Sequence, residues 1–412
     1  MLKFPVTEPQ GPGAAAGNSA TISCPDLLSF VPLAGLAMAQ KFSINELLPP
    51  WVARIRPYPP GKPIEEVERE LGHSAVKLAS NENPLGPSPR ALEALRNSFD
   101  RANFYPDGGG YYLRRKLAEF QQLDMSQIIL GAGSTDLIEL VAKTFLTAGD
   151  QGITSQSAFY IYRLAIEGMG AELIQTPLRE NAFDLAAIAH AVTQRTKVIY
   201  IANPNNPTGR MVTADNMDRF LDALPPRVLV VLDEAYYEYV RDPDYSRSID
   251  YVRNGRNVLV LRTFSKVYGL AGLRLGYGMG HPELIEALNR VRSPFNANSL
   301  AQAAGLAAIG DQEHVARSVE ANTREMKFVT EELALAGVRY TPSVGNFLLV
   351  DTGRDCEEDF IRLMHEGVIV RPMKLYGFPT SLRVTIGRHE DNEKFLEGLA
   401  RVARIPERRI KR

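Results

Sequence analysis

The stretch that decides the fold is T-F-S-K-V-Y-G-L-A-G-L-R at residues 263–274, which follows directly on the apolar run N-V-L-V-L at residues 257–261. A lysine among apolar and glycine residues is partly desolvated, and desolvation lowers its pKa. The neutral amine that results can attack an aldehyde and form a Schiff base. Taken alone, Lys266 is better explained as a surface lysine, because lysines are rarely buried. The rest of the chain reverses that preference.

Around this stretch, from residue 127 onward, apolar runs of strand length alternate with helical patterns. The inner runs, 198–201 and 228–232, are apolar throughout rather than alternating, as in strands that are buried on both faces. The sequence therefore predicts an α/β fold whose mostly parallel central sheet has helices on both faces. The predicted strands are 127–130, 152–154, 172–175, 197–202, 227–232, 257–262 and 274–279, and the predicted helices are 136–147, 160–168, 185–192 and 214–223.

After residue 279 the pattern changes to longer helices with few strands, which predicts a smaller α+β domain. In this region helices are expected at 282–291, over 300–335, at 357–366 and at 391–402, and strands at 345–350 and 382–386. In the N-terminal part of the chain, helices are expected at 42–51, at 64–71 and from 88. The expected boundaries are 1–41 for a disordered or leader-like extension, 42–84 for an N-terminal arm packing with the small domain, 85–295 for the large domain and 296–412 for the small domain. For the extension, a dispensable segment is favoured over a true signal peptide.

Composition excludes several classes of function. The formal net charge is −1, with Lys+Arg 47 against Asp+Glu 48, so nucleic acid is not an expected partner. The apolar segment 27–39 is too short for a membrane span and contains Pro32. Cys24 and Cys356 lie in unrelated contexts and the six histidines show no ligand spacing, which argues against a metal site and fits a reducing, cytoplasmic location.

Three polar clusters follow directly on three predicted buried strands, at residues 203–209, 233–236 and 263–266. Ligands of open α/β sheets bind at the carboxyl ends of the strands, so we expect the three clusters to meet there. Asp233 ends an apolar run, and a carboxylate beside a buried strand needs a cationic partner, for which a protonated pyridine nitrogen would serve. From this motif alone, a helix N-cap or a structural salt bridge is an equally good explanation.

A fourth cluster, G-A-G-S-T-D at residues 131–136, lies between a predicted strand and a predicted helix. Small residues at a helix N-terminus leave backbone N–H groups free, which suits phosphate, although such turns are common. The chain has neither the G-x-x-x-x-G-K-[ST] nor the G-x-G-x-x-G pattern, which argues against an NTPase or a dinucleotide-binding enzyme.

Together these motifs resemble the fold-type I, class I/II pyridoxal-phosphate (PLP) aminotransferases, and within them the histidinol-phosphate subgroup. The matching segments, from about residue 45 to 405, are 78–86, 105–108, 206–209, 233–236, 265–266, 274 and 367–373. The resemblance implies a PLP-binding large domain and a homodimer with shared sites. It also implies interconversion of histidinol phosphate and 2-oxoglutarate with imidazole-acetol phosphate and glutamate, in histidine biosynthesis.

The resemblance also implies a role for each matched residue. Lys266 would hold PLP as a Schiff base and shuttle a proton, Asp233 would pair with the pyridinium nitrogen, and Tyr236 and Asn206 would contact the ring oxygen. Other cofactor contacts would come from Gly133, Ser134, Thr135, Phe159, Thr263, Ser265, Arg274 and, from a second subunit, Tyr105. The substrate would be bound by Arg383, Arg371, Tyr58 and Asn206.

Three alternatives remain open on the same residues. An aromatic amino-acid aminotransferase would use the anion pocket for a carboxylate only. A lyase resembling threonine-phosphate decarboxylase would release carbon dioxide and need no amino acceptor. A PLP-binding transcription regulator would need a helix-turn-helix domain, for which the first 45 residues are too short and too rich in Gly and Ala.

Overall fold

A computed structural model describes residues 43–57 and 62–403 of the chain, so the predicted extension 1–41 lies outside the described residues. The chain divides into two units, 1–48 and 49–412. In the first unit, the described residues contain the one-turn helix α1 (Ile44–Leu47). The prediction of a helix over 42–51 is wrong in length, because Pro49 and Pro50 cannot continue a helix.

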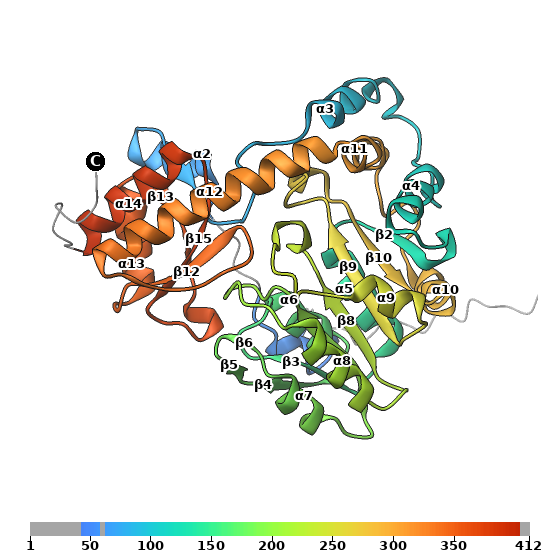
Figure 1. Cartoon of the computed structure of the whole chain (residues 1–412). Helices are drawn as coiled ribbons and strands as arrows, with labels where there is room; N and C mark the ends of the chain where they lie inside the picture. The colour runs from blue at the N-terminus through green and yellow to red at the C-terminus, as the bar shows by residue number, and fades with distance from the viewer. Residues whose placement is uncertain (1–42, 58–61, 404–412) are drawn as a thin grey trace, which may run out of the picture. The chain divides into compact units, whose positions relative to one another are not determined.

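The second unit contains a seven-stranded sheet in the order β2-β10-β9-β8-β7-β3-β4 (Figure 1). The pairs β3–β4, β3–β7, β7–β8 and β8–β9 are parallel, which confirms the mostly parallel sheet. The strands are β2 (Ile128–Gly131), β3 (Gln151–Ser155), β4 (Glu172–Thr176), β7 (Thr196–Ala202), β8 (Leu229–Asp233), β9 (Val258–Thr263) and β10 (Gly276–Gly280). Each predicted strand end lies within two residues of the observed one.

The sequence did not specify the direction of β10, and its predicted start at Arg274 is two residues too early. β10 runs antiparallel to both β2 and β9. Arg274, expected at the start of this strand, instead precedes it with a left-handed backbone (φ 56°) and terminates the short 3-10 helix η5 (Ala271–Leu273). Arg274 is therefore part of a turn that faces the end of the sheet.

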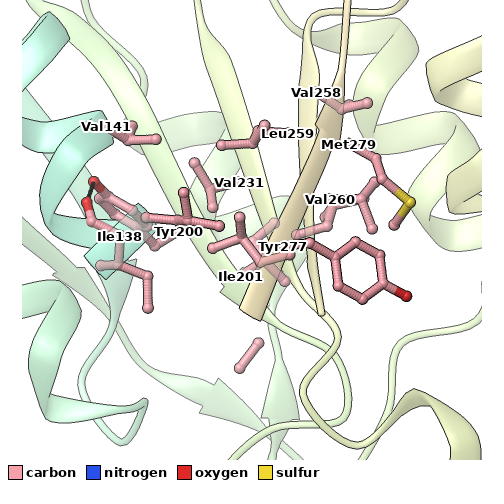
Figure 2. Packing of buried hydrophobic residues seen from close by; sticks show 14 of the residues in the cluster. Ile138, Val141, Tyr200, Ile201, Val231, Val258, Leu259, Val260, Tyr277 and Met279 are labelled. Carbon is pink, nitrogen blue, oxygen red and sulfur yellow. Dashed lines mark hydrogen bonds between the residues drawn. The ribbon is translucent and has the colours of Figure 1, made fainter. Parts of the chain in front are cut away.

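Helices between the strands pack against the sheet and bury their apolar faces. Figure 2 shows Tyr200, Val231, Val260 and Tyr277 from four neighbouring strands in this core, with Ile138 from helix α5 beside Tyr200. Each such side chain stabilises the fold by roughly 1.5–3 kcal/mol through burial. The helices are α5 (Ser134–Phe145), α6 (Tyr160–Gly168), α7 (Leu185–Ala191), α8 (Ala214–Ala223), α9 (Ser248–Arg253) and α10 (Pro282–Val291).

Helices α3 (Pro89–Arg96) and α4 (Tyr111–Gln121) pack against α11 (Ser299–Ile309). The sequence did not predict α4, because the helix starts after three glycines without a side-chain cap, and its N-cap Gly110 has a φ of 59°. The helical region expected over 300–335 consists of two helices. Asp311 separates α11 from α12 (Gln312–Ala336) and caps α12 by accepting a hydrogen bond from the His314 N–H.

A second hydrophobic core lies under a four-stranded antiparallel sheet in the order β11-β12-β15-β14. Its strands are β11 (Arg339–Thr341), β12 (Phe347–Asp351), β14 (Arg371–Pro372) and β15 (Ser381–Thr385), and its helices are α13 (Cys356–His365) and α14 (His389–Ala403). Helix α12 belongs to both cores: Val315 and Val319 lie in the first, Val329 and Leu333 in the second. Figure 1 shows α12 as the orange helix that connects the two regions.

Short elements complete the unit. The predicted helix 64–71 is confirmed as α2 (Ile64–Leu71), which ends at Gly72, and β1 (Val76–Lys77) pairs in parallel with β13 (Val368–Ile369). β5 (Leu178–Arg179) and β6 (Ala182–Phe183) form a hairpin. The remaining 3-10 helices are η1 (Val52–Arg54), η2 (Phe99–Arg101), η3 (Met125–Gln127), η4 (Tyr237–Tyr239) and η6 (Lys374–Tyr376). The domain boundaries at residues 84 and 295 remain predictions.

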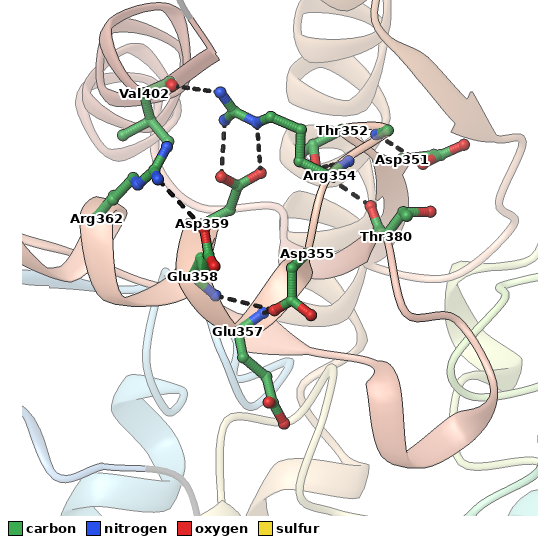
Figure 3. A network of polar contacts seen from close by, with 11 residues as sticks. Asp351, Thr352, Arg354, Asp355, Glu357, Glu358, Asp359, Arg362, Thr380 and Val402 are labelled. Atoms are coloured by element: carbon green, nitrogen blue, oxygen red, sulfur yellow. Dashed lines mark hydrogen bonds and ion pairs between the residues drawn. The ribbon is translucent and has the colours of Figure 1, made fainter.

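A polar network fixes α13 in the second core (Figure 3). Arg354 donates to both carboxylate oxygens of buried Asp359, at 2.7 and 3.4 Å, and its third nitrogen donates to the Val402 carbonyl oxygen at 2.7 Å. Asp355 caps α13 by accepting hydrogen bonds from the Glu357 and Glu358 N–H groups. These contacts link the segment that precedes α13 to the C-terminal end of α14.

Within the described part of the chain, no helix combines the length and apolar character that a membrane crossing requires. The same residues contain no cluster of three or more His, Cys, Asp or Glu side chains that could hold a metal ion.

Candidate active site

A cavity of about 290 Å³ opens at the carboxyl ends of β7, β8 and β9, where the three polar clusters were expected. Adjacent strand ends bring the clusters together: Ala202 pairs with Asp233, and the Asn203 N–H donates to the Asp233 carbonyl oxygen at 2.9 Å. Twelve residues predicted for the site line this cavity. They are Ser134, Thr135, Phe159, Asn206, Asp233, Tyr236, Thr263, Ser265, Lys266, Arg274, Arg371 and Arg383.

Lys266 lies in the loop after β9 and lines the cavity. Its Nζ donates a hydrogen bond to the Ser80 carbonyl oxygen at 2.9 Å. Burial, together with the positive charge of Arg383, lowers the pKa of Lys266 to about 7, although Glu82 and Asp233 act in the opposite direction. At neutral pH a large share of Lys266 is therefore the neutral amine, which can act as a nucleophile or as a base.

Asp233, the last residue of β8, is a buried carboxylate in the wall of the cavity. Its Oδ2 accepts a hydrogen bond from the Tyr162 hydroxyl at 2.8 Å, and its Oδ1 accepts one from the Ala235 N–H at 3.2 Å. Burial raises the pKa of Asp233 to about 6, and these hydrogen bonds only partly oppose the rise. The helix-cap explanation is wrong, because Tyr236 occupies the N-cap of the following η4.

This environment fits a protonated pyridine nitrogen. A buried carboxylate is stabilised by a nearby cation. Among the groups that shift the pKa of Asp233, Lys266 is the cation, and its effect is the smallest. A pyridinium in the cavity would supply the missing positive charge. The donor set around Asp233 is therefore compatible with PLP.

A second part of the cavity, at the start of α5, offers N–H groups and a guanidinium to an anion. Helix α5 begins there with Gly133 at its N-cap, and no side chain caps the helix. Gly133 does not line the cavity, but its φ is 81° and a Cβ on it would lie 2.7 Å from the Arg274 guanidinium. Ser265 and Thr263 add hydroxyl groups that lie 3.0 Å apart. A helix N-terminus beside an arginine is a site for phosphate.

Asn206 and Tyr236 also line the cavity, and neighbouring groups orient both. Asn206 Oδ1 accepts a hydrogen bond from Arg383 at 2.6 Å, which turns the amide so that its NH₂ group is available to donate. The Tyr236 hydroxyl accepts a hydrogen bond from the Asn81 amide at 2.9 Å, and the Tyr236 ring packs edge-on against Phe347. Both polar groups are thus fixed beside Lys266.

Arg383 and Arg371 are directly opposite each other on β15 and β14, and both line the cavity. The Arg383 guanidinium is buried, and it donates to Asn206 and to the Ala79 carbonyl oxygen. Its Nε has no hydrogen-bond partner among the described residues. A buried, unpaired guanidinium N–H is costly, so this group is suited to an anion that enters the cavity.

Among the described residues predicted for the site, Gly133 and Tyr105 do not line the cavity. Tyr105 is 84% exposed and stacks on Phe295, with ring centres 4.8 Å apart. Tyr58 lies outside the described residues.

Four further polar residues line the cavity without having been assigned a role from the sequence: Ser80, Asn81, Glu82 and Tyr162. The first three lie in the matching segment 78–86, so the motif could have indicated them. Tyr162 lies one helical turn after Phe159, and that spacing is the only sequence signal for it.

The family model for aminotransferase class I and II matches residues 74–399. Over 353 residues, the chain is 48% identical to the histidinol-phosphate aminotransferase of Moorella thermoacetica, covering 85% of this chain and 92% of that relative. Over 359 residues, it is 46% identical to histidinol-phosphate aminotransferase 2 of Pseudomonas aeruginosa, covering 86% of this chain and 97% of that relative.

Among solved structures, the chain resembles the histidinol-phosphate aminotransferase of Sinorhizobium meliloti in complex with pyridoxal-5'-phosphate. The TM-score is 0.80 at 27% identity, and the match covers 89% of this chain and 99% of that one.

Proposed function

The chain belongs to the aminotransferase class I and II family, together with relatives named histidinol-phosphate aminotransferase, and on that premise we propose the reaction of its cleft. It is a PLP-dependent transaminase that converts imidazole-acetol phosphate and glutamate to histidinol phosphate and 2-oxoglutarate, in histidine biosynthesis. The observation that supports this most is that the Lys266 amine and the buried Asp233 carboxylate line one cavity.

When bound, PLP supplies a reactive aldehyde and a ring that accepts electrons. Asp233 would hold the proton on the ring nitrogen, and Asn206 and Tyr236 would donate to the ring oxygen. Phe159 would cover one face of the ring. The phosphate would be bound by the first-turn N–H groups of Ser134 and Thr135, by the Thr263 and Ser265 hydroxyls and by Arg274, with Gly133 leaving room for that guanidinium.

Lys266 would accept the proton from the substrate Cα and then donate it to the cofactor. Its pKa of about 7 allows both transfers at neutral pH. Below pH 7 the amine is protonated and cannot attack an aldehyde. We therefore expect the rate at which apoenzyme takes up PLP to rise about tenfold per pH unit up to pH 7 and then level off. Stopped-flow absorbance at constant ionic strength measures this rate, and a flat profile below pH 7 would contradict the assignment.

The unpaired Nε of Arg383 supports an anionic substrate group in this cavity. A lysine keeps the charge but cannot make the forked contact. For Arg383→Lys we expect KM for glutamate and for histidinol phosphate to rise about 10- to 100-fold, with a smaller change in kcat. Arg388→Lys is the matched control, because Arg388 follows β15 and donates to the Pro84 carbonyl oxygen outside the cavity.

The same assay separates the candidate functions when histidinol phosphate, phenylalanine and threonine phosphate are compared with 2-oxoglutarate as acceptor. The proposed function requires the highest kcat/KM for histidinol phosphate. Turnover of phenylalanine without histidinol phosphate would establish an aromatic aminotransferase instead. Carbon dioxide release without an acceptor would establish a lyase.

We propose further that the enzyme is a cytoplasmic homodimer in which Tyr105 of one subunit reaches the cofactor phosphate of the other. Tyr105 is the most exposed of several aromatic residues along the segment 99–112, and exposed apolar patches mark interfaces. The others are Phe99, Phe104, Tyr111 and Tyr112, with Phe295 stacked on Tyr105. The cytoplasmic location is supported by the sequence, whose two cysteines, Cys24 and Cys356, lie in unrelated contexts and indicate no disulfide framework.

A shared site predicts complementation between inactive subunits. Lys266→Ala and Tyr105→Ala homodimers are both expected to be impaired, whereas a mixed dimer contains one site with neither change. Unfolding and refolding the two variants together should therefore restore part of the activity. Activity no higher than the sum of the two separate homodimers would show that Tyr105 does not act across the interface.

A further inference from the structure

Tyr162 in helix α6 is fully buried and lines the cofactor cavity. Its hydroxyl donates to Asp233 Oδ2 at 2.8 Å. One face of its ring is stacked on Tyr200, with ring centres 5.3 Å apart and planes 8° apart, and the ring of Phe159 meets it edge-on at 5.8 Å. Tyr162 therefore contacts the two residues expected to hold the cofactor ring.

The direction of the Tyr162–Asp233 hydrogen bond follows from the surroundings. Burial and the neighbouring Asp233 carboxylate raise the pKa of Tyr162 well above its ordinary value. The hydroxyl therefore keeps its proton and donates it. Asp233 accepts, and an accepted hydrogen bond favours the charged form of a carboxylate. The other titratable groups that act on Asp233 are Glu234 and Lys266, and those on Tyr162 are Tyr236 and Tyr200.

We propose that Tyr162 is a positioning residue that keeps the Asp233 carboxylate charged and turned toward the cofactor ring nitrogen. The proposal rests on the function proposed above. The Tyr162 hydroxyl donates a hydrogen bond to one oxygen of Asp233, and the Ala235 N–H donates to the other. The carboxylate is therefore held at both oxygens and cannot rotate freely.

The stacked pair also connects Asp233 to helix α5. The Tyr200 hydroxyl donates to the Ile138 carbonyl oxygen in α5 at 2.9 Å, and the N-terminus of α5 is part of the proposed phosphate site. Asp233 and α5 are thus both bonded to one rigid, buried pair of aromatic rings. The Tyr200 hydroxyl is thus engaged with α5, whereas the Tyr162 hydroxyl is engaged with Asp233.

The test compares holoenzymes of Tyr162→Phe and Tyr200→Phe. Each variant loses one buried hydroxyl from the same stack, but only Tyr162→Phe removes the hydrogen bond to Asp233. We expect Tyr162→Phe to weaken PLP binding about 10- to 100-fold and to lower kcat by about tenfold, with KM for glutamate unchanged. The pH midpoint of the bound cofactor's absorbance should move upward, because a less cationic ring withdraws less charge from the Lys266 nitrogen.

A double-mutant cycle with Asp233→Asn shows whether Tyr162 acts through Asp233. In the Asp233→Asn background the effect of Tyr162→Phe on PLP affinity should be largely lost, because the charge that Tyr162 stabilises is gone. Equal effects of Tyr162→Phe and Tyr200→Phe, or additive effects in the cycle, would show a packing role only and overturn the proposal. If wild-type protein does not bind PLP, the proposed function fails instead.

Discussion

Replacing Lys266 with alanine is expected to abolish transamination, with a fall in turnover of at least about 10⁴-fold. The change removes the amine that would hold the cofactor and transfer the substrate proton, and general acid–base catalysis by one such group alone contributes about 10²–10⁴-fold. No other lysine lines the cavity among the described residues. Turnover of histidinol phosphate and the visible absorbance of the purified protein measure the loss.

The matched control is Lys143→Ala, on the exposed side of α5. This variant should keep both the absorbance and the activity of the wild type. Because the cavity keeps its phosphate and ring contacts, Lys266→Ala should still bind PLP, although reversibly and without the wild-type absorbance. Wild-type turnover in Lys266→Ala would exclude Lys266 from the chemistry.

Asp233→Asn is expected to have the second largest effect, lowering kcat by about 10²–10³-fold. An amide cannot hold the positive charge on the ring nitrogen, so the ring would accept electrons less well. The side chains are nearly the same size, so the packing around Tyr162 and Ala235 should survive. Steady-state kinetics with glutamate measure the loss, and a change of less than about threefold would contradict the pairing.

The same substitution has the opposite effect on the stability of the apoprotein. The pKa of Asp233 is raised from 3.8 to about 6 in the folded state, so the folded protein binds this proton more tightly than the unfolded chain. The stability contribution of Asp233 is therefore most favourable below pH 4 and is lost as the pH rises through 6. At pH 7, apo Asp233→Asn should be more stable than the wild type by roughly 1–3 kcal/mol, measured by urea unfolding.

The sequence predicted the parts of the site that depend on local order. Asp233 and Lys266 each follow an apolar run, and parallel strands deliver such residues to one edge of the sheet, as observed. The direction of β10 could not be predicted, because five residues with three glycines carry no periodicity that distinguishes parallel from antiparallel pairing. That direction is decided by its neighbours β2 and β9.

Contacts between distant parts of the chain could not be predicted from the sequence either. Arg383 was predicted as an anion-binding residue, but its hydrogen bond to Asn206, 177 positions away, depends on how the two cores meet. Tyr162 was expected only as a residue of a helix, because one aromatic residue on an amphipathic helix resembles any other core residue. Its partner Asp233 is 71 positions away.

The most direct test of the central claim is borohydride reduction of the purified holoenzyme followed by peptide mass mapping. Reduction fixes the cofactor permanently on the amine that holds it. The cofactor mass should appear on the peptide that contains Lys266 and on no other lysine. Modification of a different residue, such as Lys77 beside Glu82, with Lys266 unmodified, would contradict the account.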